Sequence, residues 1–148
     1  MKILIDADAC PVKELAVKEA KKRNIEVVMV CDTSHILNDG YSKTITVDKS
    51  ADSADMKLVN IAEKGDIVVT QDFGVAAMAL SKGVYAINQN GMEYTQENID
   101  RLLFERHLSA KVRRSGGKHK TAKKRTKQDN INFQESFIKL LDKYVAML

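Results

Sequence analysis

Short apolar runs that alternate with helical segments constrain the fold of this chain more than any other feature of its sequence. Five such runs, each the length of one β-strand, lie at residues 2–6, 25–32, 44–48, 66–70 and 84–88. Helix-type apolar spacing occurs between most of them, over residues 12–23, 51–65 and 74–83. Several of the runs are almost entirely apolar, as in strands that are buried on both faces of a parallel sheet. We therefore predict an α/β fold with a mainly parallel sheet.

The last third of the chain predicts two more helices. A capping-type stretch at residues 95–98 opens the first, which continues to about residue 108. Asn132 with Glu135 resembles a capping box, which would open a second helix over residues 132–148. This helix carries an apolar stripe, so we expect it to dock on the rest of a single domain that spans the chain. The same stripe would also suit pairing with a second copy in a homodimer.

The segment over residues 110–128 differs in composition from the rest of the chain. It lacks apolar periodicity and contains two consecutive glycines, so we expect an exposed, mobile loop. Nine Lys or Arg and no acid lie between Lys111 and Lys127; without these nine, 15 of the 24 basic residues remain against 20 acidic ones, a net charge of −5. A basic stretch of this kind suits nucleic-acid phosphates, although charge runs are more often solvated surface. The candidate nucleic-acid-binding residues are Arg113, Arg114, Lys118, Lys120, Lys123, Lys124 and Arg125.

Composition argues against several classes of protein. No run of about 18 apolar residues is present, so we expect no membrane-spanning helix. The N-terminal residues lack the apolar core and cleavage site of a signal peptide. Cys10 and Cys31 are too few for a disulfide framework, and the three histidines do not have the spacing of a zinc site. We therefore expect a cytoplasmic protein whose cysteines belong to the core.

Two carboxylates, Asp6 and Asp8, stand where the first predicted strand ends. Side chains two residues apart on a strand point to the same side, so the two negative charges would repel each other. Either a bound cation neutralises this repulsion, or both carboxylates lie in a turn where water screens their charges. The position directly after an apolar strand favours the cation.

Three further carboxylates are predicted to converge on the same edge of the sheet. Asp72 follows the fourth strand, and Asp52 and Asp55 lie in the first turns of the preceding helix. Ligands of parallel α/β sheets bind beyond the carboxyl ends of the strands, where the strand order reverses. Taken alone, Asp52 or Asp55 would more often be a helix cap than a metal ligand, and Asp72 could equally be a turn residue. Their predicted convergence is what favours a functional site.

A group of carboxylates suits a hard divalent cation. Mg²⁺ and Mn²⁺ prefer oxygen ligands, and such an ion can activate water and stabilise the charge that develops in phosphodiester cleavage. The sequence contains neither a Gly-x-Ser-x-Gly motif nor a Gly-rich phosphate loop after the first strand. The candidate metal ligands are Asp6, Asp8, Asp55 and Asp72, and Asp52 is the alternative to Asp55 as the acid on the helix.

Several motifs carry a family resemblance. The segments DADACPV, DSADMKLV and GDIVVTQD, together with the later NGMEYT and SGGK, resemble the YaiI/YqxD family of bacterial proteins, a branch of the PIN-like nuclease group. The resemblance spans nearly the whole chain. It implies a PIN-like three-layer fold, in which a sheet of about five strands lies between helices.

The resemblance also implies roles for the acidic residues. PIN-like nucleases place an Asp at the end of the first strand, an acid on a central helix, and an Asp in a Thr-x-Asp segment after the fourth strand. The matching residues here are Asp6, then Asp52 or Asp55, then Asp72, while Asp8 belongs to the opening motif of the family itself. The helix acid is Glu in many PIN domains, so an Asp at this place is a departure from their pattern.

Three functions follow as hypotheses. The first is a nuclease that depends on Mg²⁺ or Mn²⁺ and acts on RNA. The second is a non-catalytic nucleic-acid-binding module with a residual cation site. The third is a phosphatase of the haloacid dehalogenase type, with Asp6 as nucleophile and Asp8 as acid. The third is the least favoured, because Cys10 stands where that class has Thr and its downstream acidic motif is missing.

Overall fold

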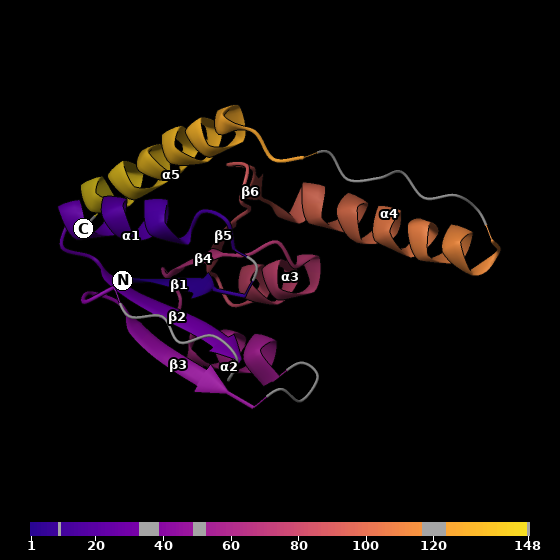
Figure 1. Cartoon of the computed structure of the whole chain (residues 1–148), viewed down its shortest axis with the longest axis horizontal. Coiled ribbons are helices and arrows are strands. Elements are labelled where there is room, and N and C mark those ends of the chain that lie inside the picture. Colours follow the sequence, from indigo (N-terminus) through magenta and orange to yellow (C-terminus); the bar gives the residue numbers. More distant parts are fainter. Residues whose placement is uncertain (9, 33–38, 49–52, 117–123, 148) are drawn as a thin grey trace.

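The computed structural model describes residues 1–8, 10–32, 39–48, 53–116 and 124–147. Within these ranges a six-stranded sheet lies between two layers of helices, which confirms the predicted α/β class (Figure 1). The strands are β1 (Lys2–Asp6), β2 (Glu26–Asp32), β3 (Lys43–Val47), β4 (Ile67–Val69), β5 (Tyr85–Ile87) and β6 (Glu93–Tyr94). The helices are α1 (Lys13–Lys22), α2 (Ser53–Ile61), α3 (Phe73–Ser81), α4 (Gln96–Arg114) and α5 (Lys127–Met147).

The order of strands creates a switch point in the centre of the sheet. The order is β3-β2-β1-β4-β5-β6, and every neighbouring pair is parallel except β5 with β6. The chain builds outward from β1 through β2 to β3, and then returns to add β4 and β5 on the other side of β1. The carboxyl ends of β1 and β4 therefore lie side by side at the place where α/β proteins usually bind ligands.

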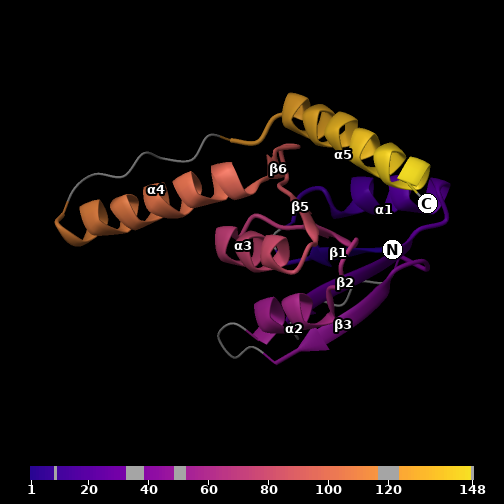
Figure 2. The same ribbon diagram turned by 180° about the vertical axis from the view of Figure 1, so that it is seen from behind.

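The sheet is apolar on both faces, as the strand sequences predict. Ile3 and Ile5 pack into the core that contains α1 and α5, whereas Leu4 packs into the core that contains α2, α3 and the start of α4 (Figure 2). The side chains of Ile3, Leu4 and Ile5 are all fully buried, which explains why apolar and polar residues do not alternate in the middle of β1. Both cysteines, Cys10 and Cys31, are buried in the first of these cores, as predicted.

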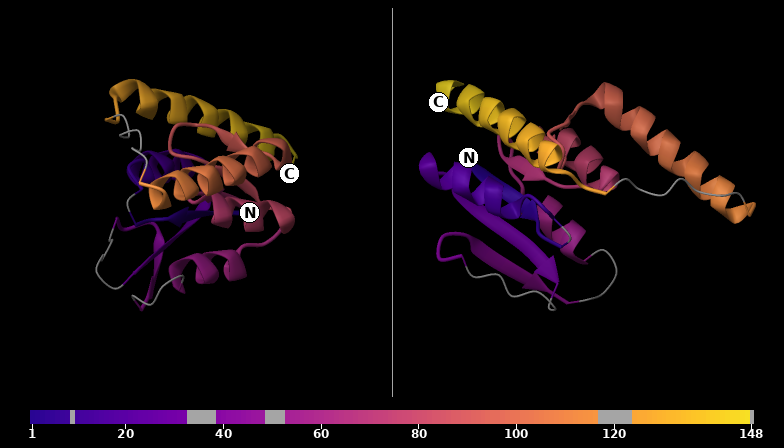
Figure 3. Two further views of the ribbon diagram at one scale, coloured as in Figure 1. Left: turned by 90° about the vertical axis from the view of Figure 1, so that its right-hand side faces the viewer. Right: turned by 45° about the horizontal axis from the view of Figure 1, so that its top comes forward.

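Helix α5 packs along α1 (Figure 3). Its buried residues are Phe133, Phe137, Leu140, Leu141 and Tyr144. Beside this apolar contact, the buried carboxylate of Glu19 accepts hydrogen bonds from Arg23 (3.0 Å), Lys22 (3.3 Å) and Gln134 of α5 (3.1 Å). Burial raises the pKa of Glu19, but these hydrogen bonds outweigh it and leave the pKa lowered. Glu19 is therefore a satisfied charge that ties α1 to α5.

Two features of the region after β5 differ from the sequence predictions. A short sixth strand, β6, pairs antiparallel with β5 through Ala86 with Tyr94 and Ile87 with Glu93. Helix α4 ends at Arg114 rather than near residue 108, so the first residues of the predicted loop are helical. The predicted start of α4 is confirmed, because the side chain of Thr95 accepts from the backbone of Asn98 and the side chain of Asn98 accepts from the backbone of Thr95.

Helix α5 begins five residues earlier than predicted. The backbone N–H of Thr126 donates to the carboxylate of Asp129 at 2.9 Å, and the backbone N–H of Asp129 donates to the hydroxyl of Thr126 at 3.3 Å. This reciprocal pair opens the helix, whereas Asn132 lies inside it. The predicted capping box at Asn132 is therefore wrong. Within the described residues, none of the helices has both the length and the apolar character that crossing a bilayer requires.

Candidate active site

One buried hydroxyl links two of the predicted site residues. Thr70 follows β4, and its Oγ1 donates to Asp6 Oδ2 at 3.0 Å and accepts the backbone N–H of Asp72 at 3.0 Å. The carboxylate at the end of β1 is thereby connected to the turn that follows β4. The structure thus brings Asp6 and Asp72 together at the switch point of the sheet.

Asp72 has a structural role as well as a place in the site. It is the N-cap of α3, and its Oδ1 accepts the backbone N–H groups of Gly74 (2.8 Å) and Val75 (3.1 Å). These bonds fix the orientation of the carboxylate. Its second oxygen, Oδ2, makes no hydrogen bond within the part of the chain that the structure describes, and 36% of the side chain is exposed. Asp72 can therefore serve as a cap and still present one oxygen to a ligand.

Asp8 and Asp6 lie on the two flanks of the end of β1. The strand ends at Asp6, so strand alternation does not set the direction of Asp8. Asp8 Oδ2 accepts the backbone N–H of Asp32, at the end of the neighbouring strand β2, at 3.0 Å. Asp6 turns the other way, towards Thr70 after β4. Their carboxylates therefore hydrogen-bond towards opposite neighbours of β1, and both remain at the same edge of the sheet. The predicted placement on one face of the strand stays a prediction.

Three other aspartates lie near enough to Asp6 for their charges to act on it. Burial raises the pKa of Asp6 to about 6; the hydrogen bond from Thr70 opposes this shift, and the charges of Asp55, Asp72 and Asp8 add to it. Asp55 stands in the first turn of α2, as predicted. Four of the five predicted acids are therefore near enough to interact electrostatically, and the fifth, Asp52, lies outside the described residues.

Tyr94 closes the site from the side of β6. Its hydroxyl donates to the carbonyl oxygen of Thr70 at 3.2 Å, and its ring meets the ring of Phe73 edge-on at 6.2 Å between centroids. Burial, together with the charge of Asp72, raises the pKa of Tyr94 to about 12. Tyr94 therefore stays protonated and holds the turn that carries Thr70 and Asp72.

A cleft with one basic wall opens beside these carboxylates. It has a volume of about 300 Å³ and is lined by Asp55, Met56, Asp72, Gly74, Val75, Met78 and Arg106. Arg106 comes from α4, and its Nη1 lies 4.0 Å from Asp72 Oδ1. The cleft therefore combines negative charge on its floor with an arginine that is 59% exposed on its wall.

The carboxylates do not form a ready-made metal site. Among the residues that the structure describes, no group of three or more His, Cys, Asp or Glu side chains has the geometry to hold a metal ion. The donor chemistry nevertheless suits a hard cation, because the set consists of carboxylate and hydroxyl oxygens. Mg²⁺ commonly takes only one or two protein carboxylates and keeps several waters, so Asp6 and Asp72 beside Thr70 would suffice to hold it.

The predicted nucleic-acid-binding residues occupy different environments. Arg113 and Arg114 lie exposed in the last turn of α4, and Lys124 is exposed before α5. Arg125 donates to Asn130 Oδ1 (2.9 Å), Asn90 Oδ1 (2.7 Å) and the carbonyl oxygen of Gln89 (2.7 Å), so it joins the start of α5 to the turn after β5. The other candidates, Lys118, Lys120 and Lys123, lie outside the described residues.

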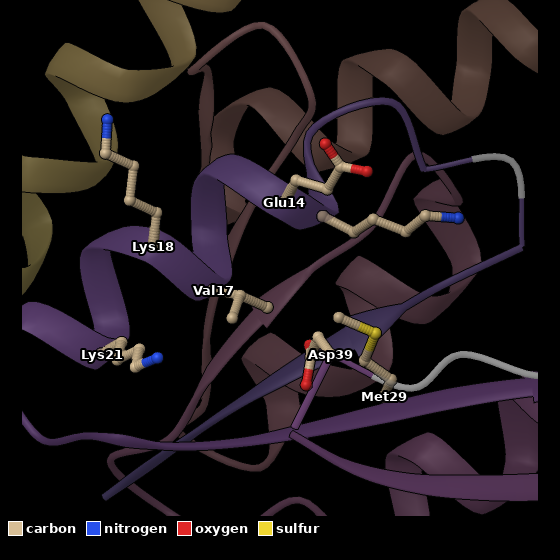
Figure 4. A pocket seen from close by; sticks show the side chains of 7 residues that line it. Glu14, Val17, Lys18, Lys21, Met29 and Asp39 are labelled. Carbon is tan, nitrogen blue, oxygen red and sulfur yellow. The ribbon is translucent and has the colours of Figure 1, made fainter. Parts of the chain in front are cut away.

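Another cavity lies away from the carboxylates of the switch point. It measures about 410 Å³ and is lined by Lys13, Glu14, Val17, Lys18, Lys21, Met29 and Asp39 (Figure 4). The side chains of Lys18 and Lys21 point apart rather than towards a common point. This cavity therefore suits a charged ligand less well than the switch point does.

Three residues of the site were not assigned a role from the sequence. Thr70 belongs to the Thr-x-Asp motif, but its bridging role depends on β1 and β4 being neighbours in the sheet. Tyr94 belongs to the strand that the sequence did not predict. Arg106 does have a sequence signal, because it continues the three- and four-residue spacing that Ile99 and Leu103 begin on the inner face of α4.

Comparisons with known proteins agree with the resemblance found in the sequence. The family model described as "Uncharacterized BCR, YaiI/YqxD family" matches residues 4–143. A UPF0178 protein of Ruminiclostridium cellulolyticum is 59% identical over 138 residues, which cover 93% of this chain and 90% of that protein. A UPF0178 protein of Alkaliphilus oremlandii is 53% identical over 148 residues, covering 100% of this chain and 96% of that protein. No solved structure matches the chain. The chain belongs to the YaiI/YqxD family.

Proposed function

We propose that this protein is a metal-dependent phosphodiester hydrolase that acts on nucleic acid, with RNA as the expected substrate. The observation that carries the proposal is the position of Asp6 and Asp72, which Thr70 links at the switch point of the sheet. Asp8 and Asp55 are near enough for their charges to act on Asp6. Negative charges that are held together by a fold, at the switch point of a parallel sheet, favour the binding of a cation. The similarity of the acidic motifs to those of PIN-like nucleases supports the same assignment.

The residues around the switch point have distinct roles in this proposal. Asp6 and Asp72 would hold the ion. Thr70 ties the carboxylate of Asp6 to the backbone of Asp72, and backbone N–H groups at the start of α3 orient the carboxylate of Asp72. Asp8 and Asp55 contribute negative charge from the flanks. The ion, when bound, supplies the positive charge that activates water and stabilises the transition state of phosphodiester cleavage.

The basic side chains supply attraction that the acidic floor of the cleft cannot. A nucleic-acid phosphate approaching Asp72 meets a negative potential, and Arg106 lies beside it to compensate. The exposed arginines at the end of α4 extend the same positive charge away from the cleft. A substrate with several phosphates therefore suits this surface better than a small phosphomonoester.

A second function is supported by one observation. Arg106, Arg113 and Arg114 are exposed on α4, and their charges can bind phosphates without a cation among the carboxylates, which suits a nucleic-acid-binding module without turnover. In that case Arg106 and the arginines of α4 would act as in the hydrolase, but the carboxylates would have no catalytic role. Activity measurements separate these two functions.

The test is cleavage of labelled RNA in Mn²⁺ or Mg²⁺ by the protein and by the Asp6→Asn/Asp72→Asn variant. We expect the double substitution to lower metal-dependent cleavage by about 100-fold or more while circular dichroism shows an unchanged fold. The control is Asp100→Asn/Asp142→Asn, which removes the same charge from two exposed positions outside the site. Equal activity in the two double variants would refute the proposal, and RNA binding without cleavage by the wild type would establish the second function.

A further inference from the structure

We propose that the inner face of α4 is the track along which a polynucleotide backbone reaches the site, with Arg106 and Arg113 as its phosphate contacts. The inference rests on the proposed function, since it concerns the substrate of that same site. It differs from the broad assignment of residues 111–127 because it selects one face of one helix. Arg106 had no role in the assignment made from the sequence.

The contacts of α4 define which of its faces is the inner one. Ile99 is buried against the core formed with α2 and α3, and Leu102 and Leu103 pack on the border of that core. Arg106 follows at the next position of the same spacing and reaches the cleft beside Asp72. The last turns of α4 project away from the sheet (Figures 1 and 3), so none of the other described helices and strands covers their inner face.

Arg113 lies on the same face as Arg106. The two residues are seven positions apart, which corresponds to two helical turns minus about 20° of rotation. Their side chains therefore leave the helix in nearly the same direction. Their separation along the axis is about 10 Å, at about 1.5 Å per residue. Arg113 is exposed in the last turn of α4. A strand that enters the cleft past Arg106 would therefore meet a second positive charge along its path.

The guanidinium of Arg106 is free to bind a phosphate. Its contact with Asp72 Oδ1 is long, at 4.0 Å, and that oxygen already accepts two backbone N–H groups of α3. Among the described residues Arg106 makes no hydrogen bond, and 59% of its side chain is exposed. An arginine with a fork of unused donors, held at the entrance to a cleft, has the geometry to bind phosphate oxygens.

The opposite wall of the cleft suits the apolar parts of a nucleotide. Met56 of α2 and Met78 of α3 line the cleft and are 49% and 37% exposed. Their thioethers are flexible and polarisable, and such side chains adapt to the faces of aromatic rings. Neither side chain offers a hydrogen-bond donor that could select one base. We therefore expect binding through the backbone with little preference for sequence.

The outer face of α4 supplies a matched control. Phe104, Leu108 and Val112 are exposed there at four-residue intervals, and Arg101 pairs with Glu105 at 4.0 Å. Arg101 is 65% exposed and differs from Arg106 by about 140° around the helix. The substitutions Arg101→Ala and Arg106→Ala therefore remove the same charge from opposite sides of one helix.

The test is the affinity of the full chain for short fluorescent oligouridylate and oligoadenylate, measured by anisotropy in EDTA over a series of salt concentrations. We expect Arg106→Ala and Arg113→Ala each to weaken binding about five- to tenfold at low salt, equally for both oligonucleotides. Each substitution should also lower the slope of log Kd against log salt by about 0.7, the contribution of one phosphate on a single strand. Arg101→Ala should stay within twofold of the wild type.

The outcomes separate this inference from the proposed function. If the wild type binds the oligonucleotides but Arg106→Ala and Arg113→Ala bind them as tightly as Arg101→Ala does, the proposed track is wrong. The hydrolase proposal is not affected by that result, because the cleavage assay tests it separately. Absence of any binding by the wild type also overturns the track. Weakened binding by the two inner-face variants supports the track even if no cleavage occurs in Mn²⁺, since EDTA excludes turnover from the measurement.

Discussion

The charged form of Asp6 destabilises the folded protein, because its carboxylate is partly buried near other negative charges. Its carboxylate is half-buried at the end of β1, and one hydrogen bond from Thr70 does not offset burial and the charges of three other aspartates. Its pKa of about 6 lies above the ordinary value of 3.8, so the folded protein disfavours the charged form. The contribution of Asp6 to the free energy of unfolding is therefore fully present below about pH 4, where its carboxyl is protonated. It is lost as the pH rises from about 4 to about 6.

The substitution Asp6→Asn tests this account at the residue scale. In EDTA at pH 7.5 we expect the free energy of unfolding to increase by about 1 to 2 kcal/mol, since one pKa unit corresponds to about 1.4 kcal/mol and solvent screens part of the effect. Near pH 3.5 the gain should vanish, because Asp6 is then protonated in both states. Urea denaturation at the two pH values measures the difference.

Asp39→Asn provides the matched comparison. Burial raises the pKa of Asp39, but hydrogen bonds from Ser42 and Tyr41 outweigh it and leave the pKa lowered. The charged form of Asp39 therefore stabilises the folded protein above the unfolded pKa, and this is lost as the pH falls. Asp39→Asn should lower the free energy of unfolding at pH 7.5. A destabilising effect of both substitutions at this pH would contradict the account of Asp6.

The acids could be named from the sequence, but their partners could not. An Asp directly after an apolar run is visible in the sequence, and the rule for parallel sheets places it at the ligand-binding edge. The bridge through Thr70 depends on β1 pairing with β4, two segments more than 60 residues apart. The hydrogen bonds of Asp6 and Asp8 to opposite neighbours of β1 depend on the strand order β2-β1-β4, which local sequence does not determine.

At the scale of elements, the contact between α5 and the turn after β5 depends on one glycine. Gly91 has a φ of +89°, and a Cβ built on it would lie 2.5 Å from the carbonyl oxygen of Asn132 and 2.8 Å from the hydroxyl of Ser136. The turn therefore packs directly against the backbone of α5. Arg125 bonds to the same turn at Gln89 and Asn90, which strengthens the attachment.

We expect Gly91→Ala to lower the free energy of unfolding by about 3 kcal/mol, because it combines a left-handed backbone with a steric clash. The matched control is Gly65→Ala, at a φ of +92° with no atom within 4 Å of the added Cβ. That substitution should cost only about 1 to 2 kcal/mol, from the backbone alone. Equal losses in urea denaturation would show that α5 does not approach the turn as closely as the structure has it.

The elements that the sequence predicted well are those with a strong apolar pattern. The five apolar runs became strands, but β6 has two residues and is too short to produce a pattern. Helix α4 extends to Arg114 because Lys and Arg are good helix formers, although they carry no apolar signal. The start of α5 depends on Thr126 and Asp129, whose capping pair competes with the similar signal at Asn132.

At the scale of the whole molecule, charge is divided between two neighbouring surfaces. The carboxylates gather at the switch point between β1 and β4. Helix α4 projects away from the sheet (Figure 1), and its arginines carry positive charge from the edge of the cleft outward. A cation bound among the carboxylates would reverse the sign of the site, and a phosphate held by α4 could then approach it. Cleavage in this arrangement depends on the cation, whereas the binding of phosphates by α4 does not.

The central claim is that the fold draws Asp6 and Asp72 into one cation site, and its most direct test is the structure of crystals soaked in Mn²⁺. Anomalous scattering locates the ion independently of any assay of activity. We expect one ordered Mn²⁺ at the switch point, within about 2.0–2.6 Å of oxygens from both Asp6 and Asp72. At a saturating concentration, Mn²⁺ found only elsewhere, or no ordered ion at all, would contradict the claim.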